Sequence, residues 1–316
     1  MSTVKLGALC WNQNTEWPSL LGAGVRADRL GYETLWTWDH VYPIVGDPHG
    51  PNYEGWLTLT AWAQATSRAR IGLMVGANPF REPTLVAKMA TTLDHISGGR
   101  AILGIGAAWF GQEHHDFGFD FGSGFPERLR WLGEALPVMR GMLDGAEPVA
   151  TGPRYRADRP RNDPLPVQAH LPICVGGSGP RVTLRLVARY ADMCNVGGGI
   201  EKVTRTEALL REHCDAVGRD HRAIERTTGL GRVTIRDSRA EAERVYRAAM
   251  ERNRVPPPWP MDGVGTPEDL AEQIAPFLEL GYHHFIADFA SPYDEESMTR
   301  LATEVRSSVE RTSATA

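Results

Sequence analysis

A glycine-rich turn between an apolar run and a helix-like segment carries the clearest chemistry in this sequence. Residues 171–181 read LPICVGGSGPR. Glycine lets the chain turn tightly and lets an anion approach backbone N–H groups, and a helix N-terminus favours a phosphate. Pro180 suits the first turn of the helix that follows, although an ordinary strand-to-helix turn is the alternative interpretation. The expected anion site consists of Gly176, Gly177, Ser178 and Gly179.

His40 is the second candidate for chemistry, because it follows the apolar run at residues 34–38. An imidazole has an unperturbed pKa near about 6.5, which suits a proton donor or acceptor. Adjacent residues of a strand point in opposite directions, so Asp39 either orients the imidazole or anchors the loop. Trp109, on a turn rich in glycine and alanine, is the leading candidate for a flat apolar wall beside a ring.

Other catalytic patterns do not occur in the sequence. The pairs His114-His115 and His283-His284 lack zinc or iron spacing, and the four cysteines form no CxxC pair. There is no GxSxG nucleophile elbow, and no evident carboxylate pair of a glycosidase. We therefore expect no metal site, and we expect buried thiols rather than disulfides.

Composition excludes several partner classes. The formal net charge is −5 and the basic residues are scattered, which argues against nucleic acid. No apolar stretch is long enough to span a bilayer, and the first residues lack the apolar region of a signal peptide. These features predict a cytoplasmic protein that is not embedded in a membrane and acts on a small molecule.

Strand-like and helix-like segments alternate along the whole chain. The eight expected strands are residues 4–10, 34–38, 69–75, 101–105, 172–175, 192–196, 227–235 and 283–288. The clearest helices are residues 83–96, which open with proline and end at two glycines, and residues 266–280, where Thr266 and Pro267 form a start signal. Residues 294–308 are the expected closing helix, and Pro276 is expected to kink the helix before it.

This alternation predicts a (β/α)8 TIM barrel, in which active sites lie at the C-terminal ends of the strands. A doubly wound open sheet is the alternative, but no GxGxxG follows the first strand. No linker separates two domains, so residues 1–316 are expected to form one. The irregular segments 107–124, 146–171 and 253–265 are expected to be loops over the site.

Several stretches resemble the luciferase-like monooxygenase superfamily, in particular its coenzyme F420-dependent oxidoreductases. The resemblance follows the family order along nearly the whole chain, and the block 69–115 is its most specific part. The stretches are LWTWDH at 35–40, ARIGLMVG at 69–76, PTLVAKMATTLDHISGGR at 83–100, LGIGAAW at 103–109 with Glu113-His114, LPICVGGSGPR at 171–181, and GTPEDL at 265–270.

This resemblance implies a barrel with loop insertions that holds F420, or alternatively FMN, at its C-terminal mouth. His40 matches the family's histidine at the reactive ring carbon. A bulge at Met74, Val75 and Gly76 matches the strand that supports the ring, often through a non-prolyl cis peptide. The implied cofactor contacts are Asp39, Met74, Val75, Gly76, Ala107, Gly176, Gly177, Ser178, Gly179 and Arg181.

One position departs from the pattern of the sugar-phosphate dehydrogenases that the family contains. Those enzymes carry a glutamate after the fourth strand, and this chain has Trp109 there. The departure predicts that His40 lacks an acidic partner, that Trp109 belongs to the catalytic site, and that sugar phosphates are poor substrates. A bulky aromatic side chain at this point resembles the reductase and monooxygenase members.

Three functions follow from the resemblance. The first is hydride transfer between F420 and a small organic substrate, with His40 as proton donor or acceptor and with Arg81, Arg181 or Lys202 near the acidic tail of the cofactor. The second is an FMNH2- and O2-dependent monooxygenase. The third is a non-catalytic flavin-binding protein. The resemblance also implies a homodimer.

Overall fold

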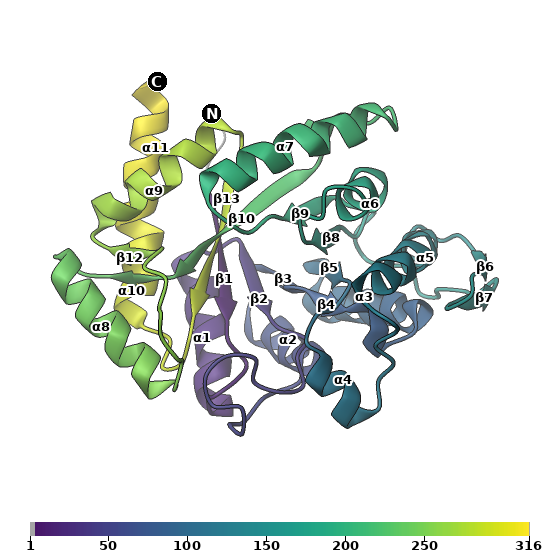
Figure 1. Ribbon diagram of the computed structural model, residues 1–316, viewed down its shortest axis with the longest axis horizontal. Helices are drawn as coiled ribbons and strands as arrows, with labels where there is room; N and C mark the ends of the chain where they lie inside the picture. Colours follow the sequence, from purple (N-terminus) through teal and green to yellow (C-terminus); the bar gives the residue numbers. More distant parts are fainter. Residues whose placement is uncertain (1–3, 316) are drawn as a thin grey trace.

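A closed barrel of parallel strands organises the computed structural model, which describes residues 4–315 (Figure 1). The last strand lies beside the first, with Cα partners running from Lys5–His284 to Cys10–Phe289. In order around the barrel the strands are β1 (Lys5–Cys10), β2 (Thr34–Thr37), β3 (Arg70–Leu73) with β4 (Gly76–Ala77), β5 (Ala101–Gly106), β8 (Ile173–Gly176), β9 (Met193–Asn195), β10 (Glu225–Arg232) and β13 (His284–Phe289). The predicted (β/α)8 architecture is therefore confirmed.

Helices surround the barrel, and one follows most strands (Figure 1). Their apolar faces pack against the outward-facing side chains of the strands in a common core. The α-helices are α1 (Trp17–Leu30), α2 (Gly55–Ala65), α3 (Pro83–Ser97), α4 (Gly111–Phe117), α5 (Phe125–Leu143), α6 (Thr183–Tyr190), α7 (Ile200–Asp215), α8 (Arg239–Arg252), α9 (Pro267–Glu279), α10 (Glu295–Arg300) and α11 (Arg306–Thr315). Short turns η1 (Asn78–Phe80), η2 (His221–Ala223) and the π-helical η3 (Leu301–Val305) complete the helical segments of the described chain.

Start and stop signals in the sequence mark the helix ends as expected. Gly98 ends α3 in the left-handed region, at φ +68°. At the start of α9, Thr266 and Asp269 form a reciprocal capping box before Pro267. The predicted closing helix is present, but η3 interrupts it between α10 and α11.

Two predicted strands are shorter than the sequence pattern indicates. The third ends at Leu73, a cis peptide joins Met74 to Val75, and β4 resumes pairing with β5. The seventh ends at Arg232, after Gly231 has taken a φ of +82°. The chain then forms β11 (Thr234–Ile235), which leaves the barrel to pair with β12 (Val264–Gly265). The first break confirms the bulge and non-prolyl cis peptide that the family resemblance implied at Met74 and Val75. The second was not predicted, because apolar residues continue past Gly231.

A polar network occupies the N-terminal end of the barrel. Thr34 Oγ1 lies 2.8 Å from His284 Nε2, and Glu225 contacts both His284 Nδ1, at 3.0 Å, and Lys5 Nζ, at 2.8 Å. Burial would raise the pKa of Glu225, but the hydrogen bond and charge of His284 and the attraction of Lys5 lower it to about 2. These groups satisfy one another beside a cavity of about 270 Å³ at this end of the barrel, and such a polar network is typical of a structural face.

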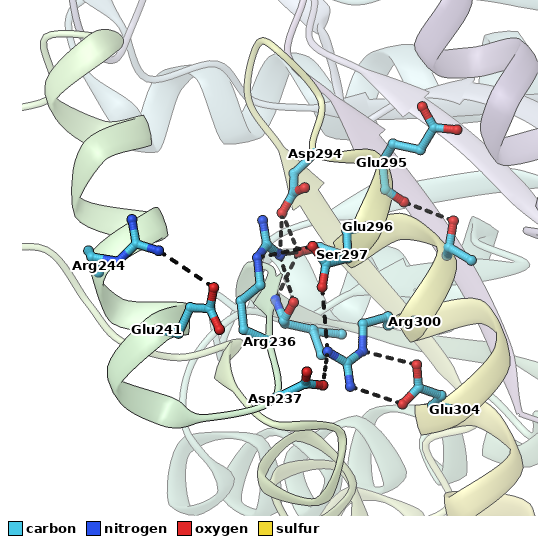
Figure 2. A network of polar contacts seen from close by, with 12 residues as sticks. Arg236, Asp237, Glu241, Arg244, Asp294, Glu295, Glu296, Ser297, Arg300 and Glu304 are labelled. Atoms are coloured by element: carbon cyan, nitrogen blue, oxygen red, sulfur yellow. Dashed lines mark hydrogen bonds and ion pairs between the residues drawn. The ribbon is translucent and has the colours of Figure 1, made fainter.

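Ion pairs hold the C-terminal helices against the β11 segment (Figure 2). Arg236 Nη1 contacts Asp294 Oδ2 at 2.9 Å and Ser297 Oγ at 3.1 Å. Arg300 contacts Asp237 at 2.9 Å and Glu304 at 2.9 Å. These contacts fix β11, and hence the start of α8, relative to the end of the barrel.

The four cysteines are unpaired and buried, as predicted. Within residues 4–315, no helix combines the length and the hydropathy needed to cross a membrane.

Candidate active site

A cavity of about 410 Å³, here called the main pocket, opens at the C-terminal ends of the strands. It gathers residues from β4, β5, β8 and β9, from the segment after β2, and from α5 and α6. Its lining residues are Trp38, Asp39, His40, Ile44, Met74, Val75, Gly76, Ala77, Gly106, Ala107, Ala108, Trp109, Phe125, Leu129, Leu132, Gly176, Gly177, Ser178, Gly179, Thr183 and Asn195. The structure thus brings every predicted site residue together except Arg181, which is exposed and outside the lining.

His40 is held by a carboxylate in the wall of the main pocket. Its Nδ1 lies 2.8 Å from Oε1 of Glu113, whose side chain is only 1% exposed. The other carboxylate oxygen of Glu113 accepts from the backbone N–H of Val41 at 2.9 Å. With Nδ1 bound to a carboxylate, Nε2 is left free to face the pocket. This geometry orients one ring nitrogen for proton transfer.

The prediction that His40 lacks an acidic partner is therefore wrong. We expected the acid on the turn directly after the fourth strand, where Trp109 stands, but Glu113 reaches back from the first turn of α4. The available signal was the Glu113-His114 pair within the family-like block. Glu113 lies four residues beyond Trp109 in the sequence, but the short helix α4 brings its side chain back to the strand end.

Asp39 anchors the loop rather than the imidazole. Its carboxylate accepts from Arg81 at 2.7 Å and from the N–H of Ala77 at 2.8 Å, and Arg81 also pairs with Glu54 at 2.8 Å. Burial raises the pKa of Asp39, and the charge and hydrogen bond of Arg81 oppose that rise. Arg81 is committed to two carboxylates, so it is not a free charge for a cofactor tail.

The cis peptide region projects Val75 into the main pocket between two glycines. A Cβ at Gly106 or at Gly176 would lie 2.7 Å from Cγ2 of Val75, closer than real Cβ contacts. The glycines at the ends of β5 and β8 therefore make room for this side chain. Val75 forms an apolar ridge of the kind that can support a flat ring.

The glycine turn has free N–H groups beside the ridge. Gly177 takes a φ of +112°, which side chains other than glycine rarely adopt, and its N–H donates to Asn195 O at 3.2 Å. The amides of Ser178 and Gly179 donate to no residue in the described range 4–315. Pro180 does not open the helix as predicted, because α6 begins at Thr183. The turn is nevertheless a cradle of backbone donors, which fits a phosphate oxygen.

Aromatic side chains border the mouth of the main pocket. The rings of Trp109 and His40 are 5.6 Å apart at 75°, and Trp109 is 61% exposed. The opposite wall comes from α5, through Phe125, Leu129 and Leu132. This α5 wall was not predicted from the sequence, because its apolar residues have the spacing of ordinary helix packing. The pocket is thus apolar around a single oriented imidazole.

Comparison with known proteins places the chain in a family. The family model of the luciferase-like monooxygenases matches residues 5–259, and the chain belongs to that family. Among curated relatives, an F420-dependent glucose-6-phosphate dehydrogenase from Microbacterium testaceum is 27% identical over 318 residues, covering 89% of this chain and 90% of the relative.

Solved structures of family members have the same fold. The coenzyme F420-dependent tetrahydromethanopterin reductase from Methanopyrus kandleri superposes with a TM-score of 0.79 at 19% identity, covering 98% of this chain and 100% of the other. The oxygenating component of 3,6-diketocamphane monooxygenase from Pseudomonas putida, in complex with FMN, gives a TM-score of 0.75 at 19% identity, with 98% and 99% coverage. The relatives are therefore oxidoreductases and monooxygenases that use F420 or FMN.

Proposed function

We propose that this protein is an F420-dependent oxidoreductase that transfers a hydride to or from a small organic substrate, with His40 as the proton donor or acceptor. The observation that carries the proposal is the His40–Glu113 pair at 2.8 Å, in the same pocket as the free N–H groups of the glycine turn. An oriented imidazole beside a ring support and a phosphate cradle is the arrangement that such chemistry needs.

The residues of the main pocket fit a tricyclic ring that carries a phosphate. The ridge of Val75 supports a flat ring, and the amides of Ser178 and Gly179 are donors that lack acceptors in the described chain. The volume of about 410 Å³ lies within the usual range for small-molecule sites. A bound deazaflavin supplies the hydride carrier.

The remaining steps belong to the protein. Glu113 keeps the proton on Nδ1 of His40, so that Nε2 exchanges a proton with the substrate as the hydride moves. Trp109, Phe125 and the α5 wall exclude water from the reacting centre. Sugar phosphates remain a poor match for this apolar wall, in spite of the dehydrogenase relatives.

The alternative is an FMNH2- and O2-dependent monooxygenase, because FMN offers the same combination of ring and phosphate. Equilibrium binding separates the two. Trp38 and Trp109 line the pocket, so their fluorescence should be quenched by either ligand. We expect F420 to bind more tightly than FMN, and tighter binding of FMN would reverse the assignment.

A further inference from the structure

A second cavity of about 560 Å³ opens at the same end of the barrel as the main pocket. It lies at the ends of β10 and β13 and reaches the start of α7 and one face of α9. Near β9 the two cavities are lined by residues that are close in the chain, Asn195 in the first and Gly198 in the second. Trp38 of the main pocket packs on Trp11, with ring centroids 5.1 Å apart and planes tilted by 35°.

Arg232 and Asp288 form the floor of the second cavity on adjacent strands. They are Cα partners in the register between β10 and β13, which places them at the same height in the barrel. The guanidinium of Arg232 lies over the ring of Trp11, 5.1 Å from its centroid. Both side chains therefore stand at the level of the strand ends, where ligands of this fold bind.

Neither side chain has a polar partner. In the described range 4–315, the side chains of Arg232 and Asp288 make no hydrogen bond or ion pair, and Nε of Arg232 is buried. Burial raises the pKa of Asp288 to about 7, although the charge of Arg232 opposes the rise. The buried Nε of Arg232 and the half-buried carboxylate of Asp288 both lack a hydrogen-bonding partner, and an unmet buried donor is costly, which points to a ligand that satisfies both side chains.

The charges around this pair select the kind of ligand. Two exposed carboxylates, Asp262 and Glu272, also line the cavity, so an anionic group would face three acids. A cationic ammonium group would be attracted by these acids but carries no acceptor for the N–H groups of Arg232. A neutral group that carries an acceptor next to a donor satisfies Arg232 and Asp288 together. The aromatic rings of Tyr246 and Phe277 supply an apolar wall for the body of such a molecule.

We propose that the second cavity binds the substrate of the reaction through a neutral amide-type group, such as a carboxamide or a lactam. Arg232 donates to the carbonyl oxygen of that group, and Asp288 accepts from its N–H. The inference rests on the proposed function: the reacting end of the substrate lies beside His40 in the main pocket with the cofactor, and the amide-type group extends into the second cavity.

Three compounds of similar size test the recognition directly. Benzamide, benzoate and benzylamine present a neutral, an anionic and a cationic group on one aromatic body, and calorimetry measures their binding to the full chain. We expect benzamide to bind about 10-fold more tightly than either charged compound. Equal or tighter binding of benzoate or benzylamine would overturn the proposal.

Substitutions assign the binding to the floor of the second cavity. Asp288→Ala and Arg232→Met should each weaken benzamide binding by about 10-fold, since each removes one charge-assisted hydrogen bond. Glu279→Gln, which changes an exposed glutamate of α9 outside the lining, is the matched control and should bind normally. If one variant does not fold, the other decides, and unchanged affinity in a folded variant refutes the assignment.

Cofactor titrations on the same proteins keep the two proposals apart. Failure to bind F420 with intact preference for benzamide would contradict the proposed function alone. Normal F420 binding without preference for benzamide would contradict the substrate class alone.

Discussion

The main pocket and the second cavity lie side by side at one end of the barrel, but they differ in whether their polar side chains are paired. In the main pocket His40 is bound to Glu113 and Asp39 to Arg81, and the remaining side chains are largely apolar. In the second cavity the side chains of Arg232 and Asp288 have no hydrogen-bond or ion-pair partner within the described chain. A site that positions a reacting ring needs rigid, satisfied side chains, whereas a site that recognises a ligand keeps its hydrogen bonds for it.

The largest expected effect concerns the imidazole of the main pocket. His40→Ala should lower turnover by roughly 100-fold or more if the side chain transfers a proton, while the affinity for F420 stays near normal. Steady-state kinetics and cofactor titration check this together. Unchanged turnover would remove His40 from the mechanism.

Loss of the carboxylate that holds the imidazole should have a smaller effect. Glu113→Gln keeps the size of the side chain but removes its charge, and we expect kcat to fall by about 10-fold to 100-fold. Because Glu113 holds Nδ1 of His40 at 2.8 Å, the variant should lose kcat while its affinity for F420 stays near normal, and steady-state kinetics with cofactor titration check both. An unchanged kcat would remove Glu113 from the positioning of His40.

The close approach between Val75 and the glycines can be tested by adding one methyl group. Gly176→Ala places a Cβ 2.7 Å from Val75, and the overpacking should lower the free energy of unfolding by about 1–3 kcal/mol and weaken F420 binding. Gly22→Ala is the matched control, because nothing lies within 4 Å of its added Cβ. Denaturant unfolding compares the free energies of unfolding of the two variants. Equal changes would show that Val75 moves aside at little cost.

The smallest expected effect is a pH-dependent change in stability caused by Asp288 in the second cavity. The pKa of Asp288 rises from 3.8 to about 7 on folding, so ionisation of Asp288 opposes folding above about pH 4. Asp288→Asn should therefore stabilise the protein at pH 8, and the gain should grow between pH 4 and 7. Urea unfolding at several pH values measures it.

Glu225 provides the control of opposite sign. Its pKa is lowered from 4.5 to about 2, so its carboxylate stabilises the fold above about pH 4.5 and this contribution is lost as the pH falls through 2. Glu225→Gln should destabilise the protein at neutral pH. Near pH 2 the variant and the unchanged protein should have the same stability. If Asp288→Asn destabilised the protein at neutral pH, as Glu225→Gln is expected to do, the claim that Asp288 lacks a stabilising partner would be disproved.

The fold was predictable because its signals are local. The eight apolar runs, the glycines after α3 and the capping box of α9 each depend on residues close together in the chain. The strand break at Met74 was implied by the family resemblance and not by local periodicity, and the break at Gly231 was not predicted, since apolar residues continue past both. Boundaries of this kind depend on neighbouring strands, which a local pattern does not contain.

The site was predictable only in part. Strand-end position selected His40, Trp109 and the glycine turn, and all of them line the main pocket. The family resemblance also placed Arg181 in the site, but the structure leaves it exposed outside the lining. Strand-end position missed Glu113, because a carboxylate on a following helix reaches the imidazole through space.

The sequence by itself determined the barrel, the family to which the chain belongs and the strand ends where chemistry is expected, because each follows from periodicity or from contiguous motifs. Only the tertiary structure decided which polar groups are satisfied. Glu113 pairs with His40, and Arg81 pairs with Asp39. Arg232 and Asp288 form no hydrogen bond or ion pair within residues 4–315, although they are Cα partners on adjacent strands. Hydrogen bonds form over about 3 Å and depend on side-chain direction, which the order of residues does not specify.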